Sequence, residues 1–271
     1  MRIAEAPDAL PGTAGGMKGR FDLSGLCARE NTMPGIPRTA VVVFCIAVTA
    51  ALAGCAGFES AGSGPAAEAP AYRVGDRWAY RAQDGFLTAE HWEETHAISA
   101  LGADGIGARI AQKGPSRDIA RAELWSAPGL VQIGAVFDNE TRRFATPLER
   151  YRFPLAAGQS WSQFVDNYNE TTKAPGQINR YVRVRGWEKV ITPAGTFDAL
   201  AMHVVMHLDD EEFWRFATQC NYTVWYAPAV RGVVREEKRA QYLQKNGDHD
   251  SGGLIRTQNA VVELLSFTPG S

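Results

Sequence analysis

Apolar and polar residues alternate with a period of two in short runs between residues 72 and 267. The clearest run is ALAMHVVMHL, residues 199–208. Because successive side chains of a β-strand point to opposite faces, this run forms one apolar row. The row is Leu200, Met202, Val204, Met206 and Leu208. The pattern predicts a half-buried strand whose apolar row faces the core.

Other runs and the segments between them support the same fold class. NRYVRVRGW (179–187) alternates likewise, and VVELLSF (261–267) is an apolar strand near the C-terminus. Turn-forming residues separate the runs at 103–105, 128–129, 193–195 and in NGDHDSGG (246–253). Such short connections predict antiparallel neighbours in one mainly β domain, residues 72–271. DDEEFWRFATQ (209–219) is the one candidate helical turn, and its alternative is a polar hairpin end.

Two segments place Gly three residues before Trp. Gly75 precedes Trp78 and Gly158 precedes Trp161. Each predicts a turn that leads into a strand whose Trp either fills the core or forms a ligand platform. The repetition predicts two half-sheets, or two meanders, within the domain.

Five segments in this order resemble a broad group of bacterial periplasmic proteins and lipoproteins of uncharacterised function. They are YRVGDRWAY, FPLAAGQSW, VITPAGTFDAL, TVWYAPAVRGVVREE and VVELLSF. The resemblance implies a strongly curved antiparallel sheet or open half-barrel, similar in shape to the lipoprotein carrier and receptor proteins of the envelope. These motifs are strand starts, turns and aromatic core residues, so they imply a fold and no reaction.

An apolar run precedes the domain in AVVVFCIAVTAALAGCAGFES, residues 40–60. Its uninterrupted part, 40–54, is shorter than the ~20 residues of a membrane-spanning helix. Arg38 precedes it and small residues end it, which is the order of a secretion signal. We therefore expect a signal peptide over 33–54. LAGC also resembles the bacterial lipobox, which implies lipidation at Cys55; an ordinary buried helix is the alternative.

The segments on either side of this signal are polar. Residues 1–32 are rich in Gly and Pro and lack periodicity, so we expect an overextended reading frame that truly starts at Met33, or else at Met17. Residues 56–71 predict a flexible tether that reaches ~20 to 24 Å beyond the lipidated Cys55. Ala56 after the cysteine resembles the context of outer-membrane lipoproteins, so we expect anchoring to that membrane, on its periplasmic face.

Composition limits the kinds of partner and the covalent links that we expect for this protein. The chain is 45% hydrophobic and 21% charged, with a net charge of −2 and its basic residues scattered. Without a basic stripe, nucleic acid is excluded as an expected partner. Removal of the signal leaves Cys55 and Cys220, so no intramolecular disulfide is expected. Cys220 is interpreted as a small buried residue, with a reactive thiol as the alternative.

No candidate catalytic or metal site survives a test of spacing. His203 and His207 would lie ~13 Å apart on a strand, and His91 and His96 would face opposite sides. GQSWS lacks the second glycine of a nucleophile elbow. NGDHDSGG has its glycine one position late for a calcium loop, and the acidic run 209–212 is interpreted as a solvated turn. We expect no cofactor, no metal and no enzymatic activity.

Three functional hypotheses remain. The first is a non-catalytic outer-membrane lipoprotein that binds an apolar ligand or an envelope partner. Its candidate ligand-binding residues are Leu200, Met202, Val204 and Met206. The second is a structural or assembly lipoprotein with a filled core, and the third, a hydrolase, lacks a recognisable polar cluster.

Overall fold

The computed structural model describes residues 62–87, 89–137, 140–245 and 251–271. The expected start at Met33, the signal peptide 33–54 and the lipidated Cys55 lie outside the described residues. The first part of the tether and most of NGDHDSGG lie outside them too. Residues Phe58–Ser271 form one compact unit.

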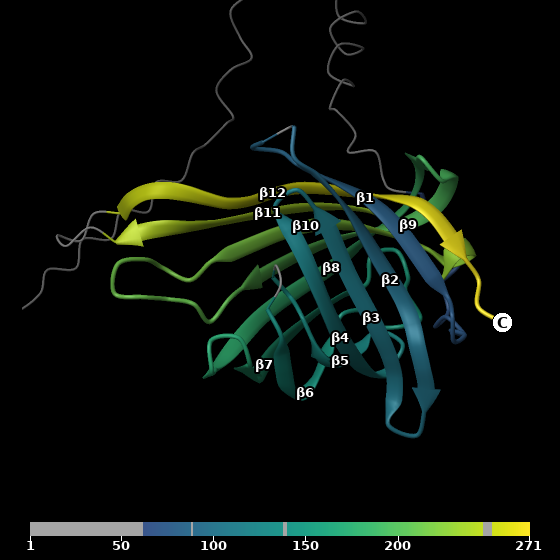
Figure 1. Ribbon diagram of the computed structural model, residues 1–271, viewed down its shortest axis with the longest axis horizontal. Helices are drawn as coiled ribbons and strands as arrows, with labels where there is room; N and C mark the ends of the chain where they lie inside the picture. The colour runs from purple at the N-terminus through teal and green to yellow at the C-terminus, as the bar shows by residue number, and fades with distance from the viewer. Residues whose placement is uncertain (1–61, 88, 138–139, 246–250) are drawn as a thin grey trace, which may run out of the picture. The chain divides into compact units, whose positions relative to one another are not determined.

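Twelve antiparallel strands form a closed barrel within the described residues (Figure 1). In chain order they are β1 (Arg77–Asp84), β2 (His91–Gly102), β3 (Gly105–Gly114), β4 (Arg117–Ala127), β5 (Leu130–Gly134), β6 (Arg142–Glu149), β7 (Ser160–Asn169), β8 (Ala174–Thr192), β9 (Gly195–His207), β10 (Gln219–Ala227), β11 (Gly232–Lys245) and β12 (Ser251–Thr268). Each strand pairs with its neighbours in sequence, and β1 pairs with β12.

The prediction of an open half-barrel is wrong, because the first and last strands close the sheet. β1 pairs along its whole length with β12, from Arg77 opposite Thr268 to Asp84 opposite Ala260. Closure pairs the backbone groups that an open edge would expose. The predicted antiparallel, mainly β class is confirmed, and the two expected half-sheets are one continuous meander.

The predicted strand 199–208 corresponds to β9, and its apolar row is buried. NRYVRVRGW lies within β8 and VVELLSF within β12. The turn predicted at 193–195 connects β8 to β9 through two residues, with Thr192 paired to Gly195. Gly195 has a φ of 133°, a backbone conformation that favours glycine.

The predicted helical turn in DDEEFWRFATQ is wrong, and its alternative, a hairpin end, is what forms. Glu212 and Arg215 exchange backbone hydrogen bonds of 3.0 and 3.2 Å across a tight turn. Phe216 and Trp214 then bond to the backbone of β11, so this segment is held in extended form. In the described ranges, the helical element is a short 3₁₀ turn, η1 (Pro228–Val230). None of the helices described is long and apolar enough to cross a membrane.

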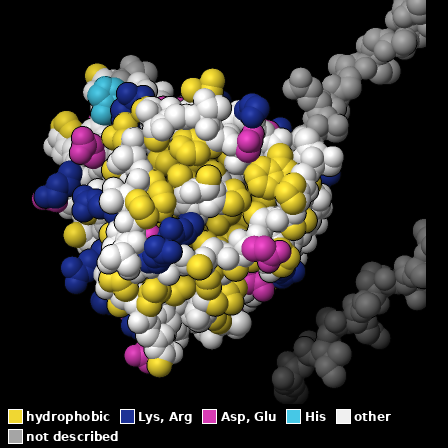
Figure 2. Space-filling view, turned by 90° about the vertical axis from the view of Figure 1, so that its right-hand side faces the viewer, with side chains coloured by type: hydrophobic (Ala, Val, Ile, Leu, Met, Phe, Trp, Pro, Cys, Tyr) yellow, Lys and Arg dark blue, Asp and Glu magenta, His cyan; other side chains and the backbone are white. Residues whose placement is uncertain are grey.

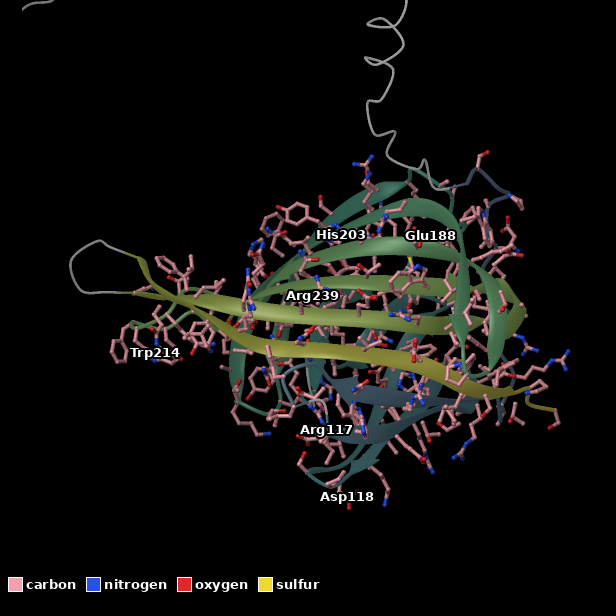
Figure 3. The ribbon with its side chains drawn as sticks, turned by 90° about the horizontal axis from the view of Figure 1, so that it is seen from above. Arg117, Asp118, Glu188, His203, Trp214 and Arg239 are labelled. Atoms are coloured by element: carbon pink, nitrogen blue, oxygen red, sulfur yellow. The ribbon has the colours of Figure 1, made fainter. Side chains whose placement is uncertain are left out.

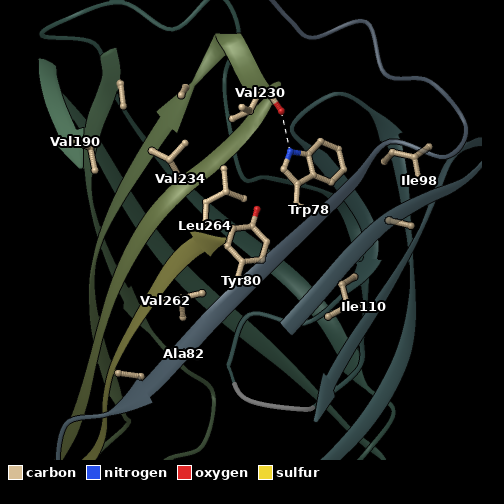
Figure 4. Packing of buried hydrophobic residues seen from close by; sticks show 14 of the residues in the cluster. Trp78, Tyr80, Ala82, Ile98, Ile110, Val190, Val230, Val234, Val262 and Leu264 are labelled. Carbon is tan, nitrogen blue, oxygen red and sulfur yellow. Dashed lines mark hydrogen bonds between the residues drawn. The ribbon is translucent and has the colours of Figure 1, made fainter. Parts of the chain in front are cut away.

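Buried tryptophans occupy the two positions that follow Gly75 and Gly158. Both glycines have φ above 80°, as the predicted turns require. Trp78 and Trp161 are buried, and Trp78 Nε1 donates a 2.7 Å hydrogen bond to the carbonyl of Val230 (Figure 4). Figure 2 looks onto the end of the molecule where β12 finishes, and hydrophobic side chains gather at its centre. Trp78 also contacts the rings of Tyr72 and Phe267, which pack against the core cluster that contains Trp78.

The described end of the predicted tether, residues 62–71, packs against the barrel and is not a free linker. Gly62 pairs with Trp187 on β8, whose Nε1 donates to the carbonyl of Pro65 at 3.1 Å. Ala67 pairs with Leu155 and is buried. Backbone hydrogen bonds and a small buried side chain hold this segment, which its Ala/Gly-rich composition does not indicate.

Candidate ligand-binding site in the barrel interior

A cavity of about 250 Å³ lies inside the barrel. Strands from most of the barrel line it, including β1 and β2, β8 and β9, and β11 and β12. Because side chains alternate between the two faces of each strand, every second residue of a strand points towards this space. The residues at these positions decide what the cavity can hold.

Part of the cavity wall is apolar and includes two of the four predicted ligand-binding residues. Val204 and Met206 on β9 line the cavity, next to Tyr222 and Val224 on β10. The other two, Leu200 and Met202, share the same inward face and do not line the cavity, and all four residues are buried in one core cluster. The whole predicted row therefore belongs to the core, and Val204 and Met206 are the part of it that also reaches the cavity wall.

Charged side chains occupy other parts of the wall. Arg231 also lines the cavity, but Asp76 neutralises it through contacts of 2.9 and 2.7 Å. The remaining cations are Arg117, Arg121, Arg150, Arg180 and Lys238. The carboxylates are Asp84, Glu94, Glu123 and Glu236. Positive groups therefore exceed carboxylates by one when His96 is neutral.

Glu94 on β2 is buried and fully engaged. Its carboxylate accepts a 2.9 Å hydrogen bond from Gln112 and lies 2.6 Å from His96 Nε2. Burial alone would raise the pKa of Glu94, but the hydrogen bond from His96 and the charges of His96, Lys238 and Arg121 outweigh it. The pKa of Glu94 is therefore held well below its ordinary value, and the group stays ionised.

Glu123 on β4 is the second buried carboxylate. It accepts hydrogen bonds from Arg150 at 3.0 Å and from Trp125 Nε1 at 2.9 Å, and Arg121 Nε lies 3.6 Å away. Burial alone would raise its pKa, but Arg150 and Arg121 lower it to about 2. On β11, Lys238 contacts Glu236 at 3.0 Å, and its pKa is raised despite burial because Glu236 and Glu94 are near.

Arg180 on β8 is a buried cation with a different environment. Its two terminal nitrogens donate to the carbonyls of Glu149 and Arg150, at 2.7 and 3.1 Å. Burial lowers the pKa of Arg180 to about 10, with Arg150 adding to the effect, so it remains charged at neutral pH. Among the described residues, no carboxylate forms an ion pair with it.

The histidines that the sequence analysis considered as metal ligands have different surroundings in the structure. His203 faces outwards and contacts Asn221 at 2.7 Å (Figure 3). His91 is exposed, whereas His96 lines the cavity, as the opposite-face prediction requires. In the part of the chain that the structure describes, no group of three His, Cys, Asp or Glu residues could hold a metal ion.

Two further predictions on single segments have different outcomes. Cys220 is a fully buried thiol on β10, which confirms the interpretation as a core residue. The acidic run 209–212 is not simply a solvated turn. Asp209 accepts 2.7 Å hydrogen bonds from the buried Arg142, which also donates to Asn167 at 2.8 Å. Asp210 accepts from Thr218.

An arm beyond the barrel carries exposed aromatic residues. It consists of residues 209–218 and the adjoining ends of β11 and β12, and Trp214 lies on it away from the barrel (Figure 3). Phe213 is 90% exposed, and Trp214 packs edge-on against Tyr242. Arg215 lies over both of these rings.

The charged cavity wall was missed by sequence reasoning. In VVREEKRAQY the inward residues Val234, Glu236, Lys238 and Ala240 alternate with outward ones, but charges occupy both faces. Strand β8 also has arginines on both faces, since Arg180 faces inwards while Arg183 is exposed. The usable signal was strict alternation through a strand, because alternation fixes direction even where polarity does not.

Comparisons with known proteins find likeness at the level of structure. No protein-family model matches the chain, and no curated protein matches it. A candidate lipoprotein from Parabacteroides distasonis is similar, with a TM-score of 0.43, 14% identity, 76% of this chain covered and 100% of that chain. A candidate exported protein with a YmcC-like fold from Bacteroides fragilis is similar with the same TM-score and identity, over 75% of this chain and 100% of that chain. These likenesses do not place the chain in a family.

Proposed function

We propose that this protein is a non-catalytic lipoprotein of the bacterial outer membrane that binds a small ligand with an apolar part inside its barrel. The lipid anchor and its membrane rest on LAGC and Ala56 in the sequence. The observation that carries the binding function is the cavity, with Val204 and Met206 on its wall.

The dimensions of the cavity limit the ligand. Its volume of about 250 Å³ lies below the roughly 300–1,000 Å³ of sites for drug-sized molecules. A single chain of modest length suits this space better than a diacyl lipid. Met206 supports such a role because an unbranched, polarisable side chain adapts to ligands of different shape.

Binding can be tested on residues 58–271, which contain all twelve strands and the three core clusters, as an independently folding domain requires. Circular dichroism and a thermal melt first establish that the fragment folds. We expect a fluorescent fatty acid to bind with micromolar affinity, roughly −8 kcal/mol. Met206→Asp should weaken binding, because it places a charge against the chain.

The matched control is Val205→Asp on the outward face of the same strand. It should leave binding unchanged. Val204→Asp is a second inward variant, used if Met206→Asp does not fold. Absence of probe binding up to near-millimolar concentration, with no lipid in native mass spectrometry, would contradict the proposal and favour a structural or assembly role.

A further inference from the structure

Two arginines on the cavity wall could interact with a further group. Arg121 has hydrogen-bond donors without a partner, and Arg180 has a charge without an ion-pair partner in the described structure. Arg121 on β4 lines the cavity, and its Nε and Nη1 are buried without a hydrogen-bond partner in the described structure. Its nearest carboxylate oxygen, on Glu123, is 3.6 Å from Nε, which is longer than a hydrogen bond. Buried donors of this kind are rare in folded proteins because an unmade hydrogen bond is costly.

Arg180 adds a buried positive charge that carbonyl groups solvate and that forms no ion pair with a described carboxylate. Its contacts with the carbonyls of Glu149 and Arg150 satisfy hydrogen bonds but cancel no charge. A buried charge without a counter-ion is unfavourable. An anion bound beside Arg180 would relieve this cost and would also balance the excess of one cation among the residues that line the cavity.

Arg150 contacts the partner of one of these arginines and bonds directly to the other. Its Nη2 contacts Glu123, the same carboxylate that Arg121 approaches, and its carbonyl accepts from Arg180. The apolar part of the wall is adjacent, because Arg180 is paired with Met206 across β8 and β9. Both residues line the cavity.

We propose that the cavity binds an anionic amphiphile, with a carboxylate or phosphate head at Arg121 and Arg180 and an alkyl chain against Val204 and Met206. This inference rests on the proposed function, since it adds a head-group site to the same cavity. Arginine suits either head because its guanidinium donates paired hydrogen bonds to both.

The test compares ligands of equal length and different charge on residues 58–271. Calorimetric titrations use decanoate, decyl phosphate, decanol and decylamine, each below its aggregation concentration. Acetate and inorganic phosphate test the head-group site without a chain. Hydrogen bonds to a charged group are strong enough that we expect decanoate or decyl phosphate to bind at least tenfold more tightly than decanol. Which anion binds tighter identifies the head.

Variants assign the effect to the named residues. Arg180→Gln should reduce the affinity for the better anion to that for decanol and leave decanol binding unchanged. Arg183→Gln, which removes an exposed arginine three residues along the same strand, is the control and should change neither. If Arg180→Gln does not melt cooperatively, Arg121→Gln provides the same comparison.

The outcomes separate the two proposals. Equal binding of decanol and the anions, or equal loss of both in Arg180→Gln, overturns the head-group site and leaves the binding function standing. If acetate or phosphate binds through Arg180 while no alkyl probe binds, the anion site stands and the apolar-ligand function falls. If no anion of either kind binds, the head-group site is overturned.

Discussion

Asp76 and Arg231 lie 155 residues apart and meet in a partly buried ion pair at one end of the barrel. Arg231 Nη1 donates to both carboxylate oxygens of Asp76, at 2.9 and 2.7 Å. Asp76 is fully buried and also accepts from the backbone amides of Arg73 and Gly270, each at 2.8 Å. One carboxylate thus joins the entry to β1, the turn between β10 and β11, and the C-terminal residues after β12.

Asp76→Asn should destabilise the fold by about 1–3 kcal/mol, because it removes the charge of a fully buried carboxylate that accepts from Arg231 and from two backbone amides. Urea denaturation of residues 58–271 measures the change. Asp104→Asn, in the exposed turn between β2 and β3, is the control and should stay within about 0.5 kcal/mol of the parent. Equal urea midpoints for Asp76→Asn and the parent would show that the pair adds nothing to stability.

Gly176→Ala tests whether the hydrogen bonds between Asp209 and Arg142 require the absence of a side chain at position 176. A Cβ on Gly176 would lie 1.8 Å from Asp209 Oδ2, so the carboxylate would have to move away from Arg142 and Asn167. We expect a loss of about 1–3 kcal/mol, as for other overpacked sites. Gly102→Ala is the matched control, since a Cβ there meets nothing within 4 Å. A parent-like melting temperature for Gly176→Ala would contradict the predicted clash.

The strands could be predicted where the alternation was clean, as in 199–208. Closure of the barrel could not, because it depends on β1 meeting β12, with Arg81 pairing to Glu263 across 182 residues. Local polarity contains no information on such a contact. The docked segment around Ala67 was missed for a similar reason, since backbone hydrogen bonds to Leu155 hold it and its small side chains give no pattern.

The site was predictable only in part. The apolar row in the sequence predicts that Val204 and Met206 point inwards. The cavity beside them could not be predicted, because it depends on which inward side chains are too short to fill the barrel interior. Glu236 and Lys238 resemble an exposed charged strand because Arg235, Glu237 and Arg239 on the other face are charged too. A charged residue is interpreted as exposed by default, and that rule fails inside a barrel that contains a polar cavity.

Stability should fall in acid as Glu123 becomes protonated. Because the folded pKa of Glu123 is about 2 and its ordinary value is 4.5, the unfolded chain binds the proton first between these values. The contribution of Glu123, about 3 kcal/mol, is complete above pH 4.5 and is lost as pH falls towards 2.

Urea midpoints at pH 7, 4 and 2.5 test this expectation. The gap between the parent and Glu123→Gln should be widest at pH 7 and narrow steadily in acid. Asp118→Asn, whose side chain is 83% exposed in the parent, should keep the pH dependence of the parent. A gap that does not change with pH would mean that ionisation of Glu123 does not stabilise the fold.

The lipid anchor predicted at Cys55 is tested in the full chain, expressed in a Gram-negative host. Acylation would attach several chains to the mature N-terminus, which is what stable anchoring requires. We expect the parent to stay with membranes after salt and carbonate washes, and Cys55→Ser to remain uncleaved or to appear in the soluble fraction without acyl mass. Cys45→Ser is the matched control, because it changes a cysteine within the apolar run and leaves LAGC intact. If Cys55→Ser is cleaved and still resists both washes, the lipobox interpretation is wrong and another part of the chain holds the protein to the membrane.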